Sequence, residues 1–466
     1  MENIFDVDLN KADFSGIVQR ADKNLKRLYP LNRSILNEGV EESLNILKEN
    51  INFDILKVKS GFKCFDWIVP EEWSIKEAYV KVGEEKIIDF KKNNLHILNY
   101  SESIDCEMSY DELLSHLYYI KEQPNAIPYR TSYYNKNWGF CMTYNQFLEL
   151  DKNVNYKVKI DSNFFKGNIN IAEKVIQGIV KDEILISAYS CHPSMANDSL
   201  SGVIVWSMLL EALQKEKPYY TYRFVLLPET IGAIAYLKLR ENEIKKNTKR
   251  GFVLTTCGGP GKYGVKSSFK GDDLIDDVVK LSFTQNEIDF IKYPFDINGS
   301  DERQYSSPYF RIPCTTISKD KYYEYKEYHT SLDNLSFVKI EYLQQTFLLY
   351  LHSIQNLELG RRSYLSLNQA CEPFLTKRDL YSTIGVTISN KLISEQHHSE
   401  KEYLTSQSSK ITGEDIDIIL WLMFYCDGSN DLLEISKKTD HTIYDLNRVA
   451  KILINLKLVK KYERQS

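Results

Sequence analysis

Hydrophobic and polar residues alternate in two patterns between residues 155 and 360. Short runs rich in branched and aromatic side chains predict β-strands, and longer stretches with apolar positions at helical spacing predict helices. The predicted strands cover residues 156–160, 183–190, 222–228, 251–256 and 314–318. The predicted helices cover residues 200–215, 231–242, 272–283 and 339–354. This alternation predicts an α/β fold, with a mostly parallel mixed sheet and helices on both faces.

The pattern changes on either side of this region. Residues 13–50 have helical spacing, whereas the next hundred residues contain short alternating runs separated by turn-forming residues, which predict an inserted β-rich domain. A polar, irregular stretch follows the α/β region, and the last segment has the helix and strand pattern of a winged helix. We predict an α/β domain over 13–57 and 151–360, an inserted β-rich lid domain over 58–150, a linker over 361–410 and a winged-helix-like domain over 411–464.

Composition narrows the classes of function. A chain of 466 residues with 43% apolar and 26% charged residues is typical of a globular protein with two or three domains. The net charge of -5 gives no general attraction to nucleic acid or to an anionic membrane. The first residues do not resemble a secretory signal, and the eight cysteines form no CxxC pair. We therefore expect a cytoplasmic protein without membrane or nucleic-acid partners, and the sequence is compatible with a homo-oligomer.

Candidate metal ligands follow two of the predicted strands. His192 and Asp198 lie on one loop between a strand and a helix, and imidazole and carboxylate together suit zinc. Taken singly, His192 is more simply explained as a hydrogen-bonded loop histidine, and Asp198 can be an ordinary helix N-cap. His329 follows the strand at 314–318, and Asp333 or a backbone carbonyl could accept its second ring proton.

A candidate general base follows a third strand. Glu229 lies directly after residues 222–228, where a carboxylate can accept a proton from water at a metal, although an acid at a helix N-terminus is also stabilised by the helix dipole. Three strand ends therefore each present a residue suited to a metal or a base, in a chain with only eight histidines. We predict that they form one site.

Four further side chains are candidates for the site: Asp301 as a second catalytic residue, and the other three for substrate contacts. Arg303 could bind a substrate carboxylate with its two-pronged guanidinium, and Asp301 could orient a ligand or bind a substrate amine. Both are also explained as surface charges. Arg130 and Tyr134, in the tyrosine-rich part of the insert, could line the mouth of a cleft, or the aromatic residues there could form the core of the small domain.

Read in order, these segments resemble the zinc aminopeptidase family that includes bacterial leucyl aminopeptidases and glutaminyl cyclases. The similar motifs are Asn-Asp-x-x-Ser-Gly at 197–202, Glu-x-x-Gly at 229–232, Ser-Asp at 300–301 with Ile-Pro at 312–313, and Tyr-His-Thr-x-x-Asp at 328–333. The resemblance implies zinc held by His192, Asp198 and His329, with Glu229 as the base and a peptide or aminoacyl amide as substrate. Residues 28–34, 65–73 and 372–381 are similar to a narrower group of bacterial aminopeptidase-like proteins with an inserted β-rich domain and a C-terminal winged helix.

Three departures from the family pattern affect the expected metal count. Ser194 stands where the family has an aspartate near the first histidine, Thr230 stands where it has a glutamate ligand, and residues 254–257 contain no carboxylate. Two dications need more carboxylates than remain, so one zinc per chain is favoured over two. Cys257 could be a substitute ligand, but a buried structural thiol is the simpler interpretation.

Three functions remain open at this point. The first is a zinc hydrolase of the aminopeptidase type. The second is a single-zinc amidase, deacylase or aminoacyl transfer enzyme acting on a small or carrier-bound substrate. The third is a catalytically silent binding protein that uses the winged helix for interactions. The missing carboxylates favour the third function, whereas retention of His192, Asp198, Glu229 and His329 together argues against it.

Overall fold

The chain divides into two compact units. The computed structural model describes residues 3–375, 378, 380 and 415–463. The larger unit contains Asp13–Phe283 and Ile288–Leu351, and the smaller contains Met1–Ala12, Thr284–Glu287 and His352–Ser466. The predicted linker at 361–410 and the segment at 372–381 lie partly outside the described residues.

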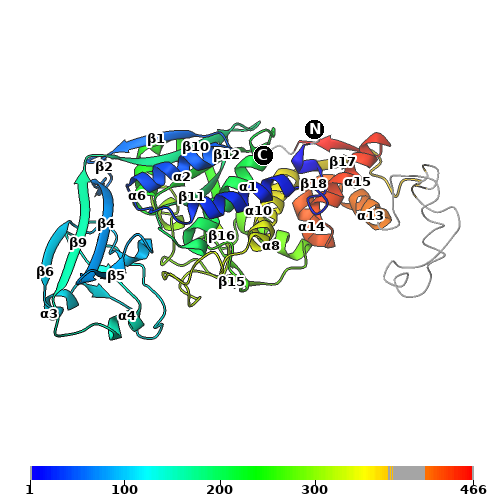
Figure 1. Ribbon diagram of the computed structural model, residues 1–466. Helices are drawn as coiled ribbons and strands as arrows, with labels where there is room; N and C mark the ends of the chain where they lie inside the picture. Colours follow the sequence, from blue (N-terminus) through cyan, green and yellow to red (C-terminus); the bar gives the residue numbers. More distant parts are fainter. Residues whose placement is uncertain (1–2, 376–377, 379, 381–414, 464–466) are drawn as a thin grey trace, which may run out of the picture. The chain divides into compact units, whose positions relative to one another are not determined.

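An eight-stranded mixed sheet forms the centre of the larger unit (Figure 1). Its strands in spatial order are β1 (Asp54–Lys59), β10 (Asn168–Ile176), β12 (Thr221–Leu227), β11 (Glu183–Tyr189), β13 (Thr248–Leu254), β16 (Cys314–Lys319), β14 (Tyr263–Lys266) and β15 (Phe290–Tyr293). The central strands β12, β11, β13 and β16 pair in parallel, whereas β1, β10 and β14 pair antiparallel with their neighbours on the central side. The predicted α/β fold is therefore confirmed.

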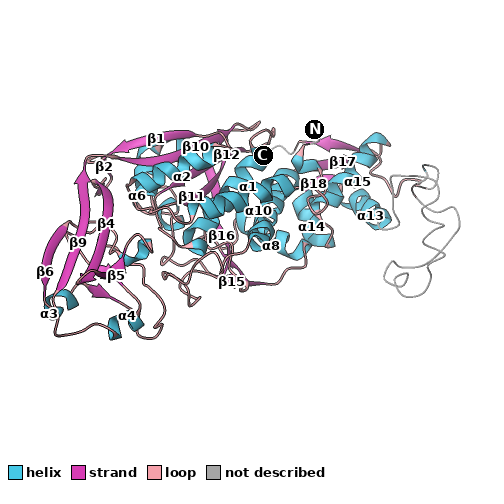
Figure 2. Cartoon of the chain, viewed as in Figure 1, coloured by secondary structure: helices cyan, strands magenta, loops and turns pink. Residues whose placement is uncertain are grey.

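Helices flank this sheet (Figure 2). They are α1 (Ser15–Leu28), α2 (Glu38–Lys48), α5 (Gly202–Leu213), α6 (Ile231–Leu239), α7 (Glu241–Asn247), α8 (Leu274–Gln285), α9 (Glu302–Tyr305) and α10 (Ile340–Gly360). Every residue of β11 and β12 is buried, as expected for parallel strands covered on both faces. No helix in the described part of the chain is long and apolar enough to cross a membrane.

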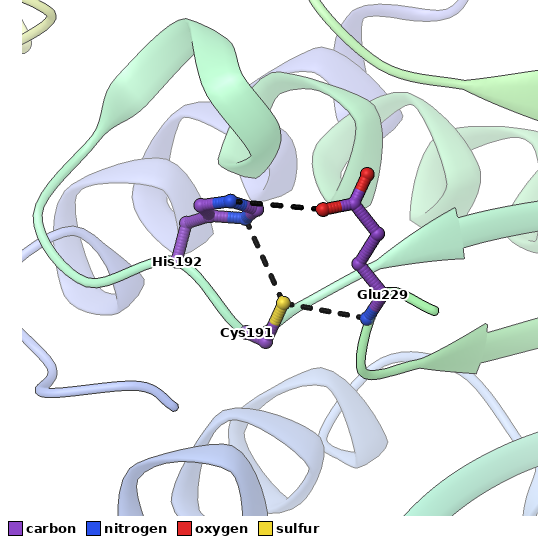
Figure 3. A group of neighbouring side chains, drawn as sticks. All are labelled: Cys191, His192 and Glu229. Carbon is purple, nitrogen blue, oxygen red and sulfur yellow. Dashed lines mark hydrogen bonds and ion pairs between the residues drawn. The ribbon is translucent and has the colours of Figure 1, made fainter. Parts of the chain in front are cut away.

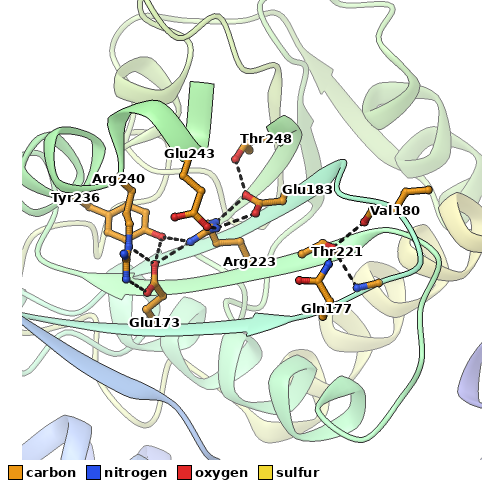
Figure 4. A network of polar contacts seen from close by, with 11 residues as sticks. Glu173, Gln177, Val180, Glu183, Thr221, Arg223, Tyr236, Arg240, Glu243 and Thr248 are labelled. Carbon is orange, nitrogen blue, oxygen red and sulfur yellow. Dashed lines mark hydrogen bonds and ion pairs between the residues drawn. The ribbon is translucent and has the colours of Figure 1, made fainter. Parts of the chain in front are cut away.

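A buried ion network ties the two central strands to α6 and α7 (Figure 4). Arg223 of β12 donates two hydrogen bonds of 2.8 Å to Glu183 of β11 and one of 2.8 Å to Glu173 of β10. Its guanidinium also contacts Glu243 of α7, and the Tyr236 hydroxyl of α6 donates to Glu173 at 2.6 Å. Only 1% of the Arg223 side chain is exposed, so burial of its charge depends on these carboxylates.

The inserted region folds around a second, antiparallel sheet of β5 (Glu85–Asp89), β4 (Glu72–Val82), β9 (Tyr156–Phe165) and β6 (Ile104–Met108). Two short pairs, β2 (Lys63–Cys64) with β3 (Trp67–Ile68) and β7 (Leu117–Tyr118) with β8 (Phe140–Cys141), and the helices α3 (Tyr110–Leu114) and α4 (Tyr144–Leu148) complete it. Residues 156–160, which we expected in the α/β sheet, therefore belong to β9 of the insert. The sheet of the insert continues past residue 150, and β10 follows β9 after only two residues.

The described residues of the smaller unit that follow α10 include three α-helices and a three-stranded antiparallel sheet. The helices are α13 (Asp415–Tyr425), α14 (Leu432–Thr439) and α15 (Ile443–Asn455), and the strand order is β18 (Asp427–Asp431), β17 (Ser363–Ser366), β19 (Val459–Tyr462). Asp431 caps α14 by accepting the N–H of Glu434, whose carboxylate accepts the Asp431 N–H in return. Assignment of this unit as a winged helix stays a prediction.

Candidate metal centre

The first two candidate ligands lie where β11 passes into α5. The segment Ala196–Ser201 forms a π-helical turn, in which Asp198 alone has extended backbone angles (φ -106°, ψ 99°). Irregular helical turns of this kind often occur at functional sites. Gly202 then begins α5 against β13, where a Cβ atom would lie only 2.3 Å from the carbonyl oxygen of Leu254. Glycine at this position therefore allows the helix start to approach the sheet.

Three candidate ligands converge in the structure. His192, Asp198 and His329 each offer one atom, and these atoms all lie within 4.8 Å of one another. His329 Nε2 and Asp198 Oδ2 are 2.9 Å apart, yet both are buried atoms without a hydrogen-bond partner of acceptable geometry. Buried polar atoms are normally satisfied, so an unsatisfied nitrogen and oxygen facing each other fit a shared cation. Nitrogen and carboxylate donors are those that zinc prefers.

Electrostatics keep two of these groups in forms that bind a cation. Burial lowers the pKa of His192 to about 4. Burial raises the pKa of Asp198, but the neighbouring His192 and His329 and the hydrogen bond from Tyr189 outweigh it and lower this pKa to about 2. His192 is therefore neutral and Asp198 ionised at neutral pH, as metal binding requires.

Asp333 supports the turn that carries Asp198. Its carboxylate accepts the backbone N–H groups of Asn197 at 2.6 Å and Asp198 at 2.9 Å, and the Tyr325 hydroxyl at 3.1 Å. We had expected Asp333 or a carbonyl group to accept a proton from the His329 ring. The structure instead uses this buried carboxylate to satisfy two N–H groups of the turn.

His192 and Glu229 point toward each other from adjacent strand-end loops (Figure 3). His192 Nε2 lies 3.9 Å from Glu229 Oε2, and the Cys191 sulfur accepts the backbone N–H of Glu229 at 3.3 Å. Cys191, His192 and Glu229 form a second group of side chains that could share a cation. The buried Arg33 donates a hydrogen bond from Nε to the carbonyl oxygen of His192 at 3.0 Å. This bond anchors the backbone of the loop that carries His192.

Glu229 lies in an acidic environment. Burial and the charges of Asp301 and Asp198 raise the pKa of Glu229, and burial raises the pKa of Asp301 to about 7. The side chain of Glu229 is nevertheless 25% exposed. Asp301 Oδ1 accepts the N–H of Thr230 at 2.7 Å, and Arg303 donates to the Thr230 hydroxyl at 3.3 Å. Asp301, predicted as a second catalytic residue, and Arg303, predicted to bind substrate, thus both contact the residue that follows Glu229.

The insert contributes side chains to the centre. Pro128 forms a β-bridge with Thr330, and the Tyr129 N–H donates to the carbonyl oxygen of His329 at 2.8 Å. The ring centre of Tyr129 lies 5.3 Å from that of His192 and 5.2 Å from that of His329. Tyr129 is thus one of the residues that contact both histidines.

Arg130 and Tyr134, the two residues of the insert that we predicted at the mouth of a cleft, follow Tyr129 in the same segment. Tyr134 is 50% exposed and packs edge-on against Trp67, and Arg130 is exposed and donates to the carbonyl oxygen of its neighbour Tyr129. Among the described residues, neither side chain forms a hydrogen bond, ion pair or ring contact with the candidate ligands. Sequence reasoning singled out this tyrosine-rich segment but missed Tyr129, because spacing alone does not show which ring faces the histidines.

Four residues around the centre have strained backbone angles. Ser194, Thr230, Thr256 and His329 all have positive φ angles, between 43° and 62°, although none is glycine. Such conformations cost on the order of 1–3 kcal/mol each and cluster at functional sites.

The structure also shows where Ser194, Thr230 and Cys257, the residues that we compared with the family pattern, lie. Ser194 accepts a hydrogen bond from Asn94, Thr230 starts α6, and the buried Cys257 is absent from both candidate cation groups.

Comparison with known proteins assigns the family. A family model described as "Domain of unknown function (DUF4910)" matches residues 23–360. The chain belongs to the DUF4910 family. This DUF4910 chain is 37% identical over 461 residues to a protein of Clostridium acetobutylicum named "Putative polysaccharide biosynthesis protein with aminopeptidase-like domain". The match covers 99% of this chain and 100% of that protein.

Solved structures place the DUF4910 chain among aminopeptidase-like folds. A crystal structure described as a "putative peptidase" from Clostridium acetobutylicum has a TM-score of 0.84 and 36% identity, covering 96% of this chain and 98% of that one. The zinc aminopeptidase of Bacillus subtilis has a TM-score of 0.52 at 12% identity, covering 73% of this chain and 94% of that one. The second likeness shows a shared fold, and its low identity carries no argument about activity.

Proposed function

We propose that this protein is a zinc-dependent hydrolase of the aminopeptidase type. The observation that carries the proposal is the convergence of His192, Asp198 and His329 at the strand ends of an aminopeptidase-like fold. The names of the two Clostridium acetobutylicum proteins, one with an aminopeptidase-like domain and one a peptidase, support the same class of reaction. The proposed substrate is a peptide or aminoacyl amide.

Each residue of the centre has a proposed role. His192, Asp198 and His329 would hold the zinc, which when bound supplies a Lewis acid for the scissile carbonyl and lowers the pKa of water at the centre. Glu229 accepts a proton from the attacking water and passes it to the leaving amine. Its partly exposed carboxylate, 3.9 Å from His192 Nε2, is within reach of both solvent and the ligands.

Substrate binding is assigned to charges beside Glu229. Arg303 binds a substrate carboxylate, and Asp301 binds a substrate amine or orients a ligand. Asp301 is well placed for this role because its Oδ2 is buried without a hydrogen-bond partner, while Oδ1 holds Thr230. Arg130 and Tyr134 are proposed to contact the distal part of a longer substrate, since both side chains are exposed on the segment that follows Tyr129.

A second candidate function follows from the name of the Clostridium acetobutylicum relative. That protein is assigned by name to polysaccharide biosynthesis. Removal of an acyl group from an amino sugar is also amide hydrolysis, and it would use the same zinc and the same base. An amidase or deacylase acting on a small or carrier-bound substrate is therefore the alternative, since one fold can host several reactions.

Replacement of Glu229 by glutamine tests the proposal. Glu229→Gln preserves the shape of the side chain but cannot accept a proton, so hydrolysis should fall about 100- to 10,000-fold while zinc content is unchanged. The measurement is turnover of aminoacyl amides, short peptides and N-acyl amino sugars by the zinc-loaded enzyme. Glu327→Gln, on the segment that leads to His329, is the matched control and should keep full activity. If the wild type cleaves none of these substrates with zinc loaded, the protein is a binding protein instead.

A further inference from the structure

The hydroxyl of Tyr189 donates a hydrogen bond to one oxygen of the Asp198 carboxylate. Tyr189 is the last residue of β11, and its side chain is buried. The hydroxyl donates to Asp198 Oδ1 at 2.6 Å and lies 2.6 Å from the Thr255 hydroxyl oxygen. A phenol has a single proton to donate, so the Thr255 hydroxyl must donate to the Tyr189 oxygen. Asp198 Oδ1 is therefore held by a relay of two hydroxyl groups.

The other oxygen of this carboxylate has a different environment. Asp198 Oδ2 faces His329 Nε2 at 2.9 Å and accepts no hydrogen bond. The two oxygens of Asp198 thus differ before any cation binds: Oδ1 accepts a short hydrogen bond from Tyr189, and Oδ2 accepts none.

The Tyr189 side of Asp198 lacks the groups that a second cation needs. In the parts of the chain that the structure describes, two groups of three side chains could share a cation, and both include His192. Neither includes a residue of the segment after β13, where Thr255 and Thr256 offer hydroxyl groups instead of carboxylates. A cation at Oδ1 would have to displace the phenol proton.

We infer that Tyr189 is a positioning residue that holds Asp198 Oδ1 and leaves Oδ2 as the oxygen that binds a single cation. This inference rests on the proposed zinc site but not on catalysis. Groups that form hydrogen bonds to a metal ligand set its orientation, and their removal typically weakens metal binding about 10- to 100-fold. Tyr189 would act in this way through Oδ1, on the side of the carboxylate away from His329.

The test is calorimetric titration of the metal-free full-length protein with zinc, with elemental analysis of the loaded protein. The wild type should bind one equivalent. Tyr189→Phe should still bind one equivalent, with a dissociation constant about 10- to 100-fold higher. Tyr236→Phe is the matched control, because its hydroxyl also donates to a buried carboxylate at 2.6 Å, that of Glu173 in the ion network. Tyr236→Phe can lower thermal stability but should leave zinc affinity unchanged.

Three results would overturn the inference. They are two zinc equivalents of similar affinity in the wild type, an unchanged affinity in Tyr189→Phe, and an equal loss of affinity in Tyr236→Phe. If Tyr189→Phe does not fold, Thr255→Val removes the other half of the relay and should raise the dissociation constant in the same direction. Failure of the proposed function is distinguishable: one tightly bound zinc with no hydrolysis contradicts the enzyme but not the role of Tyr189, whereas no zinc binding contradicts both.

Discussion

Replacement of Arg223 by methionine should strongly destabilise the larger unit. Arg223 is 1% exposed, and its guanidinium forms ion pairs with Glu183, Glu173 and Glu243, two of which are themselves almost fully buried. Breaking a buried pair by removal of one partner costs about 3–5 kcal/mol, because the remaining charge stays buried without compensation. The unfolding entropy is about 2.1 cal/mol/K per residue, so in a unit of roughly 335 residues such a loss corresponds to a fall in melting temperature of about 4–7 °C.

Thermal unfolding at pH 7, followed by circular dichroism, measures the loss. Lys57→Met is the matched control, because Lys57 forms an ion pair with Glu41 that is about half exposed and should contribute less than about 1 kcal/mol. A melting temperature of Arg223→Met within about 2 °C of the wild type would refute the reasoning.

The same network predicts how the destabilisation depends on pH. Burial raises the pKa of Glu173, but hydrogen bonds from Arg240 and Tyr236 and the charges of Arg240 and Arg223 outweigh it and bring the pKa below its ordinary value of 4.5. A carboxyl group whose pKa is lowered by folding stabilises the fold above the unfolded value and loses that contribution as the pH falls. Because Arg223→Met removes part of this effect, the difference in melting temperature between variant and wild type should shrink below about pH 4.5. A difference that grows with acidification would contradict this interpretation.

Two further predictions concern the residues around the centre. Asp333→Ala leaves two N–H groups of the Asp198 turn without an acceptor, so zinc affinity should fall about 10- to 100-fold, and unfolding should occur at a lower temperature. An unchanged zinc titration would show that Asp333 does not support the ligand. Among the cysteines, the exposed Cys371 should react first with a maleimide, whereas burial raises the pKa of the Cys191 and Cys257 thiols and should protect them until the protein unfolds. Mass spectrometry of the labelled peptides decides this, and early labelling of Cys191 would contradict it.

The arrangement of the candidate ligands follows from a simple property of parallel sheets. β11, β12, β13 and β16 pair in parallel, so their carboxyl ends meet at one edge, and the loops after β11 and β12 carry His192 and Glu229. This is why the order of strands and helices in the sequence was enough to bring these residues together. The alternation of apolar runs also predicted the fold class, since buried parallel strands are apolar throughout.

Other features could not be predicted because they depend on partners distant in sequence. The run at 156–160 has the apolar spacing of a strand, but that spacing does not reveal whether the strand joins the α/β sheet or the insert. Likewise, the sequence predicts only that Tyr189 lies at the buried end of a strand. Its hydrogen bond to Asp198 depends on how the loop between the two residues folds. The role of Asp333 toward two backbone N–H groups depends on the π-helical turn, which no local propensity predicts.

The zinc content of the purified protein tests the central claim most directly. Elemental analysis after loading and dialysis should find one zinc per chain in the wild type. His192→Ala and His329→Ala should each lose most of it, because a centre with three protein ligands has no ligand to spare. A wild type that retains no zinc, or variants that keep the wild-type content, would contradict the assignment of this centre.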